Sequence, residues 1–139
     1  AQMQYLSQNG YTPITLDTLY GIYSSQTTAP SKPVILTFDD GYIDFYTNAF
    51  PILKRFNFHA VSFISTGLIG GSYYMSWDQI KEIQQSWLVN FESHSVTHTN
   101  LASLKYDALL KQLKRIISNF LSLSKSFTIC ISFIFFASI

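Results

Sequence analysis

The sequence predicts an α/β fold built on a parallel β-sheet, and three observations indicate it. Short apolar runs without polar alternation occur at 34–38, 60–64 and 88–92, as expected of strands buried on both faces. Segments with helical apolar spacing separate these runs. Acidic residues, histidines or glycines follow each run. Strands that alternate with helices form right-handed βαβ units, either in a doubly wound sheet or in part of a barrel.

Composition limits the classes of function. A chain of 139 residues with 47% hydrophobic content can bury one core, so we do not expect a disordered chain. Nine Lys and Arg against eight Asp and Glu give a charge of +1, so we expect no nucleic-acid partner. Aromatic residues reach 17%, which suits core packing first and sugar stacking second. We divide the chain into a helical lead-in and linker at 1–33 and a main domain at 34–139.

The lead-in is predicted to hold two short helices. The first ends at Gly10, and an extended segment around Pro13 follows it. Asp17 is expected to cap the second helix, at 18–23. Small polar residues and two prolines then indicate a connecting loop at 24–33.

The main domain is predicted to alternate strands and helices. The strand at 34–38 precedes a helix at 44–56, whose second half Pro51 starts or kinks. The strand at 60–64 leads into a glycine-rich loop at 66–74. Ser76 and Gln79 then form a capping-box pattern at the start of the next helix, before the strand at 88–92.

A long helix and an apolar segment complete the predicted elements. The helix has one apolar face, formed by Tyr106, Leu109, Leu110, Leu113, Ile116, Ile117, Phe120 and Leu121. The uncharged residues 127–139 are predicted as a fourth strand, because a helix that crosses a bilayer needs about 20 residues. We therefore expect no transmembrane span. Cys130, the single cysteine, is expected to be a core residue.

Carboxylates and imidazoles follow two of the predicted strands. Asp39 and Asp40 come directly after the strand at 34–38, and His94 and His98 follow the strand at 88–92. Because parallel strands end at one edge of a sheet, these side chains are expected to meet. Two histidines and Asp40 can bind a divalent metal and leave a coordination position for water. Asp39 is then available as a general base.

Simpler roles exist for each of these residues alone. Asp-Gly after an apolar run is often only a turn, and two histidines four residues apart can be ordinary loop residues. Their coincidence at one sheet edge favours a metal site. His59 lies at the entrance of a strand, at the opposite edge, and is interpreted as a surface residue.

The residues T-F-D-D-G at 37–41, followed by H-S-V-T-H at 94–98, resemble the first two motifs of the polysaccharide deacetylases, the NodB-homology domain of carbohydrate esterase family 4. The resemblance implies a distorted (β/α) barrel and metal-dependent removal of N-acetyl groups from a GlcNAc polymer. Asp39 matches the catalytic base of the family. Asp40, His94 and His98 match the metal ligands, and the metal is usually zinc, with cobalt or manganese as alternatives.

The lead-in adds a finer resemblance. Residues 2–20 look like the segment that precedes the domain in bacterial deacetylases of poly-N-acetylglucosamine, which implies an extracellular or cell-surface location. The later family motifs, an aromatic- or Arg-led segment ending in Pro-Tyr-Gly, a Trp motif and Leu-x-His, do not occur in the sequence. We therefore expect an incomplete barrel, a truncation or shifted reading frame after about Ser122, and self-association through the apolar C-terminal segment.

Two interpretations of function remain open at this point. The chain is either a deacetylase of a GlcNAc-containing polysaccharide or a truncated, catalytically impaired remnant that binds metal or sugar. A glycosidase that uses Asp39 and Asp40 is a remoter alternative, since adjacent residues rarely place two carboxyl groups the required ~5 to 9 Å apart.

Overall fold

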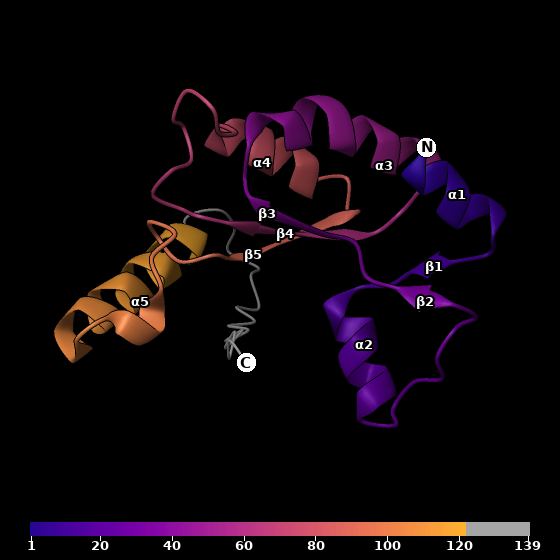
Figure 1. Ribbon diagram of the computed structural model, residues 1–139, viewed down its shortest axis with the longest axis horizontal. Coiled ribbons are helices and arrows are strands. Elements are labelled where there is room, and N and C mark those ends of the chain that lie inside the picture. Colours follow the sequence, from indigo (N-terminus) through magenta and orange to yellow (C-terminus); the bar gives the residue numbers. More distant parts are fainter. Residues whose placement is uncertain (122–139) are drawn as a thin grey trace.

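The computed structural model describes residues 1–121, and its centre is a parallel sheet of three strands. The strand predicted at 127–139, with Cys130, lies outside the described residues. Figure 1 shows two helices, α3 (Phe50–Phe56) and α4 (Trp77–Gln84), over one face of this sheet. Two others, α2 (Leu16–Tyr23) and α5 (Tyr106–Leu121), lie on the opposite side.

The three strands of the sheet end at nearly the same level. They are β3 (Thr37–Asp40), β4 (Ala60–Ile64) and β5 (Val89–Ser93), in the order β3-β4-β5. Asp40 pairs with Ile64, and Ile64 pairs with Ser93. This register confirms the predicted parallel α/β arrangement and brings the residues that follow β3 and β5 to one edge.

The first predicted strand differs from the structure. Residues 34–38 do not form one strand, because β2 (Pro33–Val34) pairs with β1 (Thr12–Pro13) in a separate two-stranded sheet. The second segment, β3, begins at Thr37 and includes both aspartates. Its residues alternate between exposed and half-buried, since within residues 1–121 only β4 pairs with β3. The prediction of a strand buried on both faces is therefore wrong for β3 and right for β4, all of whose residues are buried.

The lead-in contains the two predicted helices, with one different cap. Helix α1 (Gln2–Gln8) ends before Gly10, whose φ of 72° suits a residue without a Cβ. Helix α2 begins earlier than predicted, because the Thr15 hydroxyl accepts a hydrogen bond from the Thr18 N–H and caps it. Asp17 therefore lies in the first turn and is not the cap, which corrects the prediction.

The predicted helix at 44–56 and the predicted start of the next helix are both confirmed. The chain is helical from residue 43 onwards, and a π-helical turn, η1 (Phe45–Ala49), runs directly into α3, with Pro51 just after that turn. Ser76 and Gln79 make both hydrogen bonds of the capping box at the start of α4. The start of α4 is therefore fixed by its cap.

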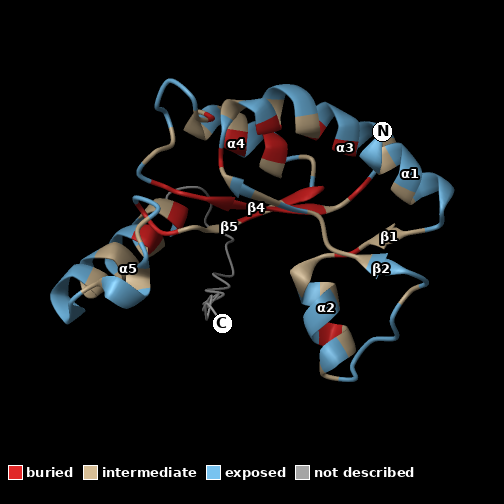
Figure 2. Ribbon diagram, viewed as in Figure 1, coloured by how far each residue is buried: buried red, intermediate tan, exposed pale blue. Residues whose placement is uncertain are grey.

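The core lies mainly between the sheet and the helices α3 and α4, as the buried segments in Figure 2 show. Its largest fully buried apolar side chains are Leu53, Ile64, Met75, Ile80, Ile83, Val61 and Val96. Helix α5 follows a short 3₁₀ turn, η2 (Leu101–Ser103), and only part of its predicted apolar face is buried. Ile116 and Phe120 join the core, whereas Tyr106 and Leu121 are exposed. Among the described residues, no helix has the length and apolar character needed to cross a membrane.

Candidate metal centre

Three side chains meet at the carboxyl edge of the sheet. Asp40 Oδ1 lies 3.5 Å from His94 Nε2 and 3.3 Å from His98 Nε2. The two Nε2 atoms are 3.1 Å apart. Asp40 ends β3 and His94 follows β5 directly, so the parallel register brings them together. The structure thus places the three predicted ligands around one point.

The spacing and chemistry of this cluster fit a divalent cation. Two ligand atoms that are each about 2.1 Å from a tetrahedral zinc ion lie about 3.4 Å apart, close to the observed separations. Asp40 Oδ1 is buried and accepts no hydrogen bond from residues 1–121. A buried carboxylate oxygen without a donor is unfavourable, and a cation between the three atoms would compensate for it. Two imidazole nitrogens and one carboxylate oxygen form a ligand set that zinc accepts.

One side of the cluster is open to solvent. The His98 side chain is 56% exposed, whereas those of His94 and Asp40 are 31% and 23% exposed. A bound ion would therefore be held from below by the sheet edge and reached from the side of His98.

Several residues in and beside the cluster have left-handed backbone conformations. Asp40, Ser95 and His98 have φ values of 70°, 65° and 54°, in the left-handed region that costs a residue other than glycine about 1–3 kcal/mol. Gly41 has a φ of 84°, and a Cβ there would lie 2.9 Å from Ile69 Cδ1. The Asp-Gly pair therefore ends β3 and also sets the direction of the Asp40 carboxylate. An ordinary turn would need only the first of these roles.

The loop after the central strand connects both sides of the cluster. The buried Ser65 donates its N–H to the Asp40 carbonyl at 3.4 Å and its hydroxyl to the His94 carbonyl at 3.0 Å. Gly67 approaches the histidine loop so closely that a Cβ would lie 2.6 Å from the Val96 carbonyl oxygen. Sequence reasoning missed Ser65, although a small polar residue at the end of a central strand was a usable signal.

Helix α5 holds the histidine loop from the other side. Gln112 accepts a hydrogen bond from the Val96 N–H at 3.1 Å and donates one to the Thr97 hydroxyl at 3.3 Å. Within the loop, the Ser95 hydroxyl accepts from the Thr99 N–H at 3.1 Å. Gln112 was also missed, because nothing in a helical pattern shows which polar residue faces a distant loop.

Two further carboxylates lie close to the ligands in the sequence. Asp39 is exposed, and its side chain makes no hydrogen bond or ion pair with residues 1–121. Glu92, two residues before His94, is half-buried, and burial together with the negative charge of Asp17 raises its pKa to about 7. Sequence reasoning did not single out Glu92.

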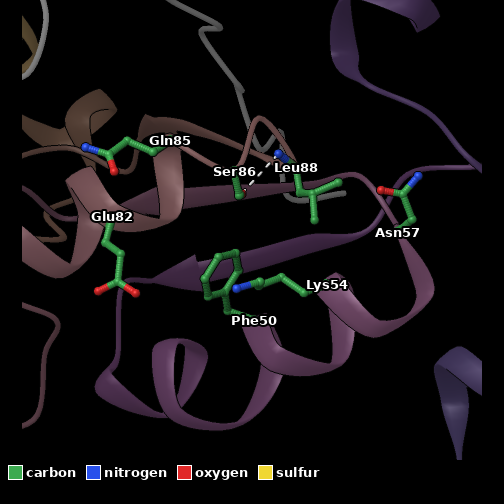
Figure 3. A pocket seen from close by; sticks show the side chains of 7 residues that line it. All are labelled: Phe50, Lys54, Asn57, Glu82, Gln85, Ser86 and Leu88. Carbon is green, nitrogen blue, oxygen red and sulfur yellow. Dashed lines mark hydrogen bonds between the residues drawn. The ribbon is translucent and has the colours of Figure 1, made fainter.

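His59 and two surface hollows lie apart from the three ligand residues. His59 lies at the other end of β4 and is half-buried, with a buried Nδ1 that has no partner in residues 1–121. The side chain is therefore less exposed than the predicted surface position implies, and Phe58 and Ala60 on either side of it in the chain are buried. A hollow of about 400 Å³ on the helical side, shown in Figure 3, is lined by Phe50, Lys54, Asn57, Glu82, Gln85, Ser86 and Leu88. A second hollow, of about 550 Å³, is lined by Thr66, Gly67, Ile69, Trp77, Lys81, Arg115 and Asn119.

Comparison with known proteins decides the family. The family model described as polysaccharide deacetylase matches residues 26–129, most of the chain. The chain therefore belongs to the polysaccharide deacetylase family. Deacetylases of this family are metal-dependent hydrolases, and the cluster of Asp40, His94 and His98 can bind a metal.

Curated relatives agree with this assignment. The poly-beta-1,6-N-acetyl-D-glucosamine N-deacetylase of Escherichia coli K12 is 35% identical over 109 residues, which cover 68% of this chain and 16% of the relative. The putative polysaccharide deacetylase YxkH of Bacillus subtilis is 34% identical, with 75% of this chain and 37% of the relative covered. The chain thus spans less than half the length of these relatives.

Solved structures agree on the fold. The Streptococcus pyogenes deacetylase PplD, solved with acetate, superposes with a TM-score of 0.79 at 30% identity, covering 88% of this chain and 54% of that protein. IcaB from Ammonifex degensii superposes with a TM-score of 0.74 at 26% identity, covering 88% and 58%. These neighbours have the (β/α) fold of NodB-type deacetylases. The predicted fold class is therefore confirmed, and this chain contains part of that fold.

Proposed function

We propose that this chain carries the metal-binding half of the active site of a hydrolase that removes N-acetyl groups from a GlcNAc-containing polysaccharide. The observation that carries the proposal is the convergence of Asp40, His94 and His98 at 3.1 to 3.5 Å in a member of this family. Relatives named as poly-beta-1,6-N-acetyl-D-glucosamine deacetylases support a β-1,6-linked polymer as substrate. An extracellular or cell-surface location is part of the proposal, as the resemblance of residues 2–20 implies.

The three ligands would hold zinc, or cobalt or manganese in its place. Two neutral imidazoles and one carboxylate leave most of the charge of a divalent cation uncompensated. When bound, such a cation polarises a carbonyl oxygen and lowers the pKa of a water molecule that it coordinates. Ser65 and Gln112 would keep the ligands in place, through the backbone hydrogen bonds described above.

Asp39 would act as the general base. Its exposed carboxylate is adjacent to Asp40 and is free of partners among residues 1–121, so it can take a proton from the attacking water. The water oxygen would add to the acetamide carbonyl, the proton taken by Asp39 would pass to the amine nitrogen, and the C–N bond would break. The products are acetate and a free amino sugar.

Acetate release tests this function. The zinc-loaded protein is incubated with a β-1,6-linked GlcNAc oligomer, and acetate is measured against a sample treated with chelator. Acetate should form only with metal present, and Asp39→Asn should abolish its release while zinc binding persists. A folded, zinc-loaded protein that releases no acetate would contradict catalysis by this chain.

A second candidate is a protein that binds metal or sugar without turnover. The sequence favours it in one respect, since residues 127–139 contain neither the proline nor the glycine of the third family motif. This candidate predicts zinc binding that is lost in His94→Ala, with no acetate formed by the wild-type protein. Zinc binding retained in His94→Ala would contradict the assigned site under both candidates.

A further inference from the structure

Two tyrosine rings stack on one another just beyond Asp40. The ring centroids of Tyr42 and Tyr74 are 4.9 Å apart, and the ring planes differ by 18°. Tyr42 is 43% exposed, whereas Tyr74 is half-buried. The less exposed Tyr74 ring therefore packs against a Tyr42 side chain that solvent can reach.

Backbone hydrogen bonds hold this pair in place. The segments of Tyr42 and Tyr74 form an antiparallel bridge. The Met75 N–H donates to the Gly41 carbonyl at 3.0 Å, and the Ile43 N–H donates to the Tyr73 carbonyl at 2.9 Å. The Met75 side chain is fully buried in the core, and this anchors the segment that carries Tyr74.

The pair lies beside the metal centre. Tyr42 is two residues from Asp40, a separation of at most about 7 Å along the backbone. Burial raises the pKa of Tyr74, and the neighbouring Tyr42 and the negative charge of Asp40 add to this shift.

The segments that carry the two tyrosines contain no basic residue. Neither residues 33–53 nor residues 56–80 contain Lys or Arg, whereas Asp39, Asp40 and Asp44 all lie close to Tyr42 in the chain. An anionic ligand would meet no cation from these segments. A pyranose ring, in contrast, offers an apolar C–H face to an aromatic ring and hydroxyl groups to solvent.

We propose that the exposed face of Tyr42, supported by Tyr74, is a stacking platform for a pyranose ring of the substrate beside the metal centre. The inference rests on the proposed function, because it names a subsite for the same polysaccharide. Tyr42 would contribute to affinity for the polymer and to its orientation, and it would take no part in holding the metal. A tyrosine suits this role because its flat ring loses little conformational freedom on binding.

Calorimetric binding of a β-1,6-linked GlcNAc oligomer to the zinc-loaded full chain tests the platform. Tyr42→Ala and Tyr42→Leu should weaken binding about tenfold, the equivalent of about 1.4 kcal/mol, whereas Tyr42→Phe keeps the ring and should bind as the wild type does. Tyr42→Leu retains apolar volume and separates loss of stacking from loss of folding. Tyr23→Ala, at an exposed position on α2, is the matched control and should change nothing.

Two results would overturn the platform: oligomer binding that is unchanged in both Tyr42→Ala and Tyr42→Leu, or a zinc-loaded wild-type protein that binds no oligomer. Zinc affinity should be the same in all variants, and a parallel loss of zinc in Tyr42→Leu would also contradict the proposal. Failure of the proposed function has a different signature. In that case the wild-type protein binds the oligomer through Tyr42 but releases no acetate.

Discussion

Single residues at the sheet edge combine a strained backbone with converging ligand atoms. Asp40 and His98 both have left-handed conformations, and Gly41 has a φ of 84°, which favours glycine. Strained conformations persist only where the surrounding structure imposes them, and they concentrate at functional sites. The type and spacing of Asp40, His94 and His98 were sufficient to predict that they would meet. Their backbone conformations were not predictable, because these depend on contacts with residues far away in the chain.

Ser65 is expected to position the ligands. Ser65→Ala removes the hydrogen bond to the His94 carbonyl but keeps the N–H that reaches Asp40. Zinc affinity, measured by competition with a chromogenic chelator, should fall about tenfold. Losing a residue that hydrogen-bonds to a metal-binding segment typically lowers metal affinity by about 10- to 100-fold. Ser62→Ala is the control, since Ser62 is equally buried in β4 but its hydroxyl has no partner in residues 1–121. Equal zinc affinities for the two variants would argue against the role of Ser65.

Glu92 makes stability depend on pH. Its pKa is raised from 4.5 to about 7 by burial and by Asp17, so the folded protein holds this proton more tightly than the unfolded chain. Its contribution to stability is therefore present at low pH and is lost as pH rises from about 4.5 through 7. In chelator, Glu92→Gln should have a higher melting temperature than the wild type at pH 8. The difference should shrink towards pH 4.5, and a constant difference across this range would contradict the assignment.

Elements differ in how well the sequence predicted them. The strand β4 and the helix α4 were predicted closely, because an uninterrupted apolar run and a capping box are local signals. The first strand was misplaced, since β2 pairs with the lead-in and β3 begins at Thr37. Pairing partners decide such boundaries, and a single sequence does not show them. The structure has Thr15, and not Asp17, as the cap of α2. Both residue types are good caps, so residue type alone does not distinguish them.

Helix α5 is expected to support the metal centre through one side chain. Gln112→Leu removes both hydrogen bonds to the histidine loop and leaves the helix intact. Zinc affinity should fall about tenfold while the circular dichroism of the folded protein stays the same. Lys111→Ala, at an exposed neighbouring position, is the control. A Gln112→Leu variant with the zinc affinity of Lys111→Ala would show that α5 does not hold the loop.

Across the molecule, the parallel sheet brings distant motifs to one edge. Asp40 and His94 are far apart in the sequence. Asp40 is the last residue of β3 and His94 comes directly after β5, and both strands pair with β4, so the sheet topology brings the two residues together. This juxtaposition was predictable because parallel βα units place strand ends together. The supporting contacts of Ser65, Gln112 and the stacked tyrosines were not predictable, because they depend on how loops and helices pack.

A zinc titration by calorimetry tests the central claim most directly, because it reports on the cluster whether or not the chain turns over substrate. The wild-type protein should bind one zinc ion per chain, and Asp40→Ala and His94→Ala should each lower the affinity by more than about 100-fold, beyond the effect of an outer-shell change. Asp39→Asn should bind zinc as the wild type does. Wild-type affinity and stoichiometry in both Asp40→Ala and His94→Ala would contradict the assignment of this metal centre.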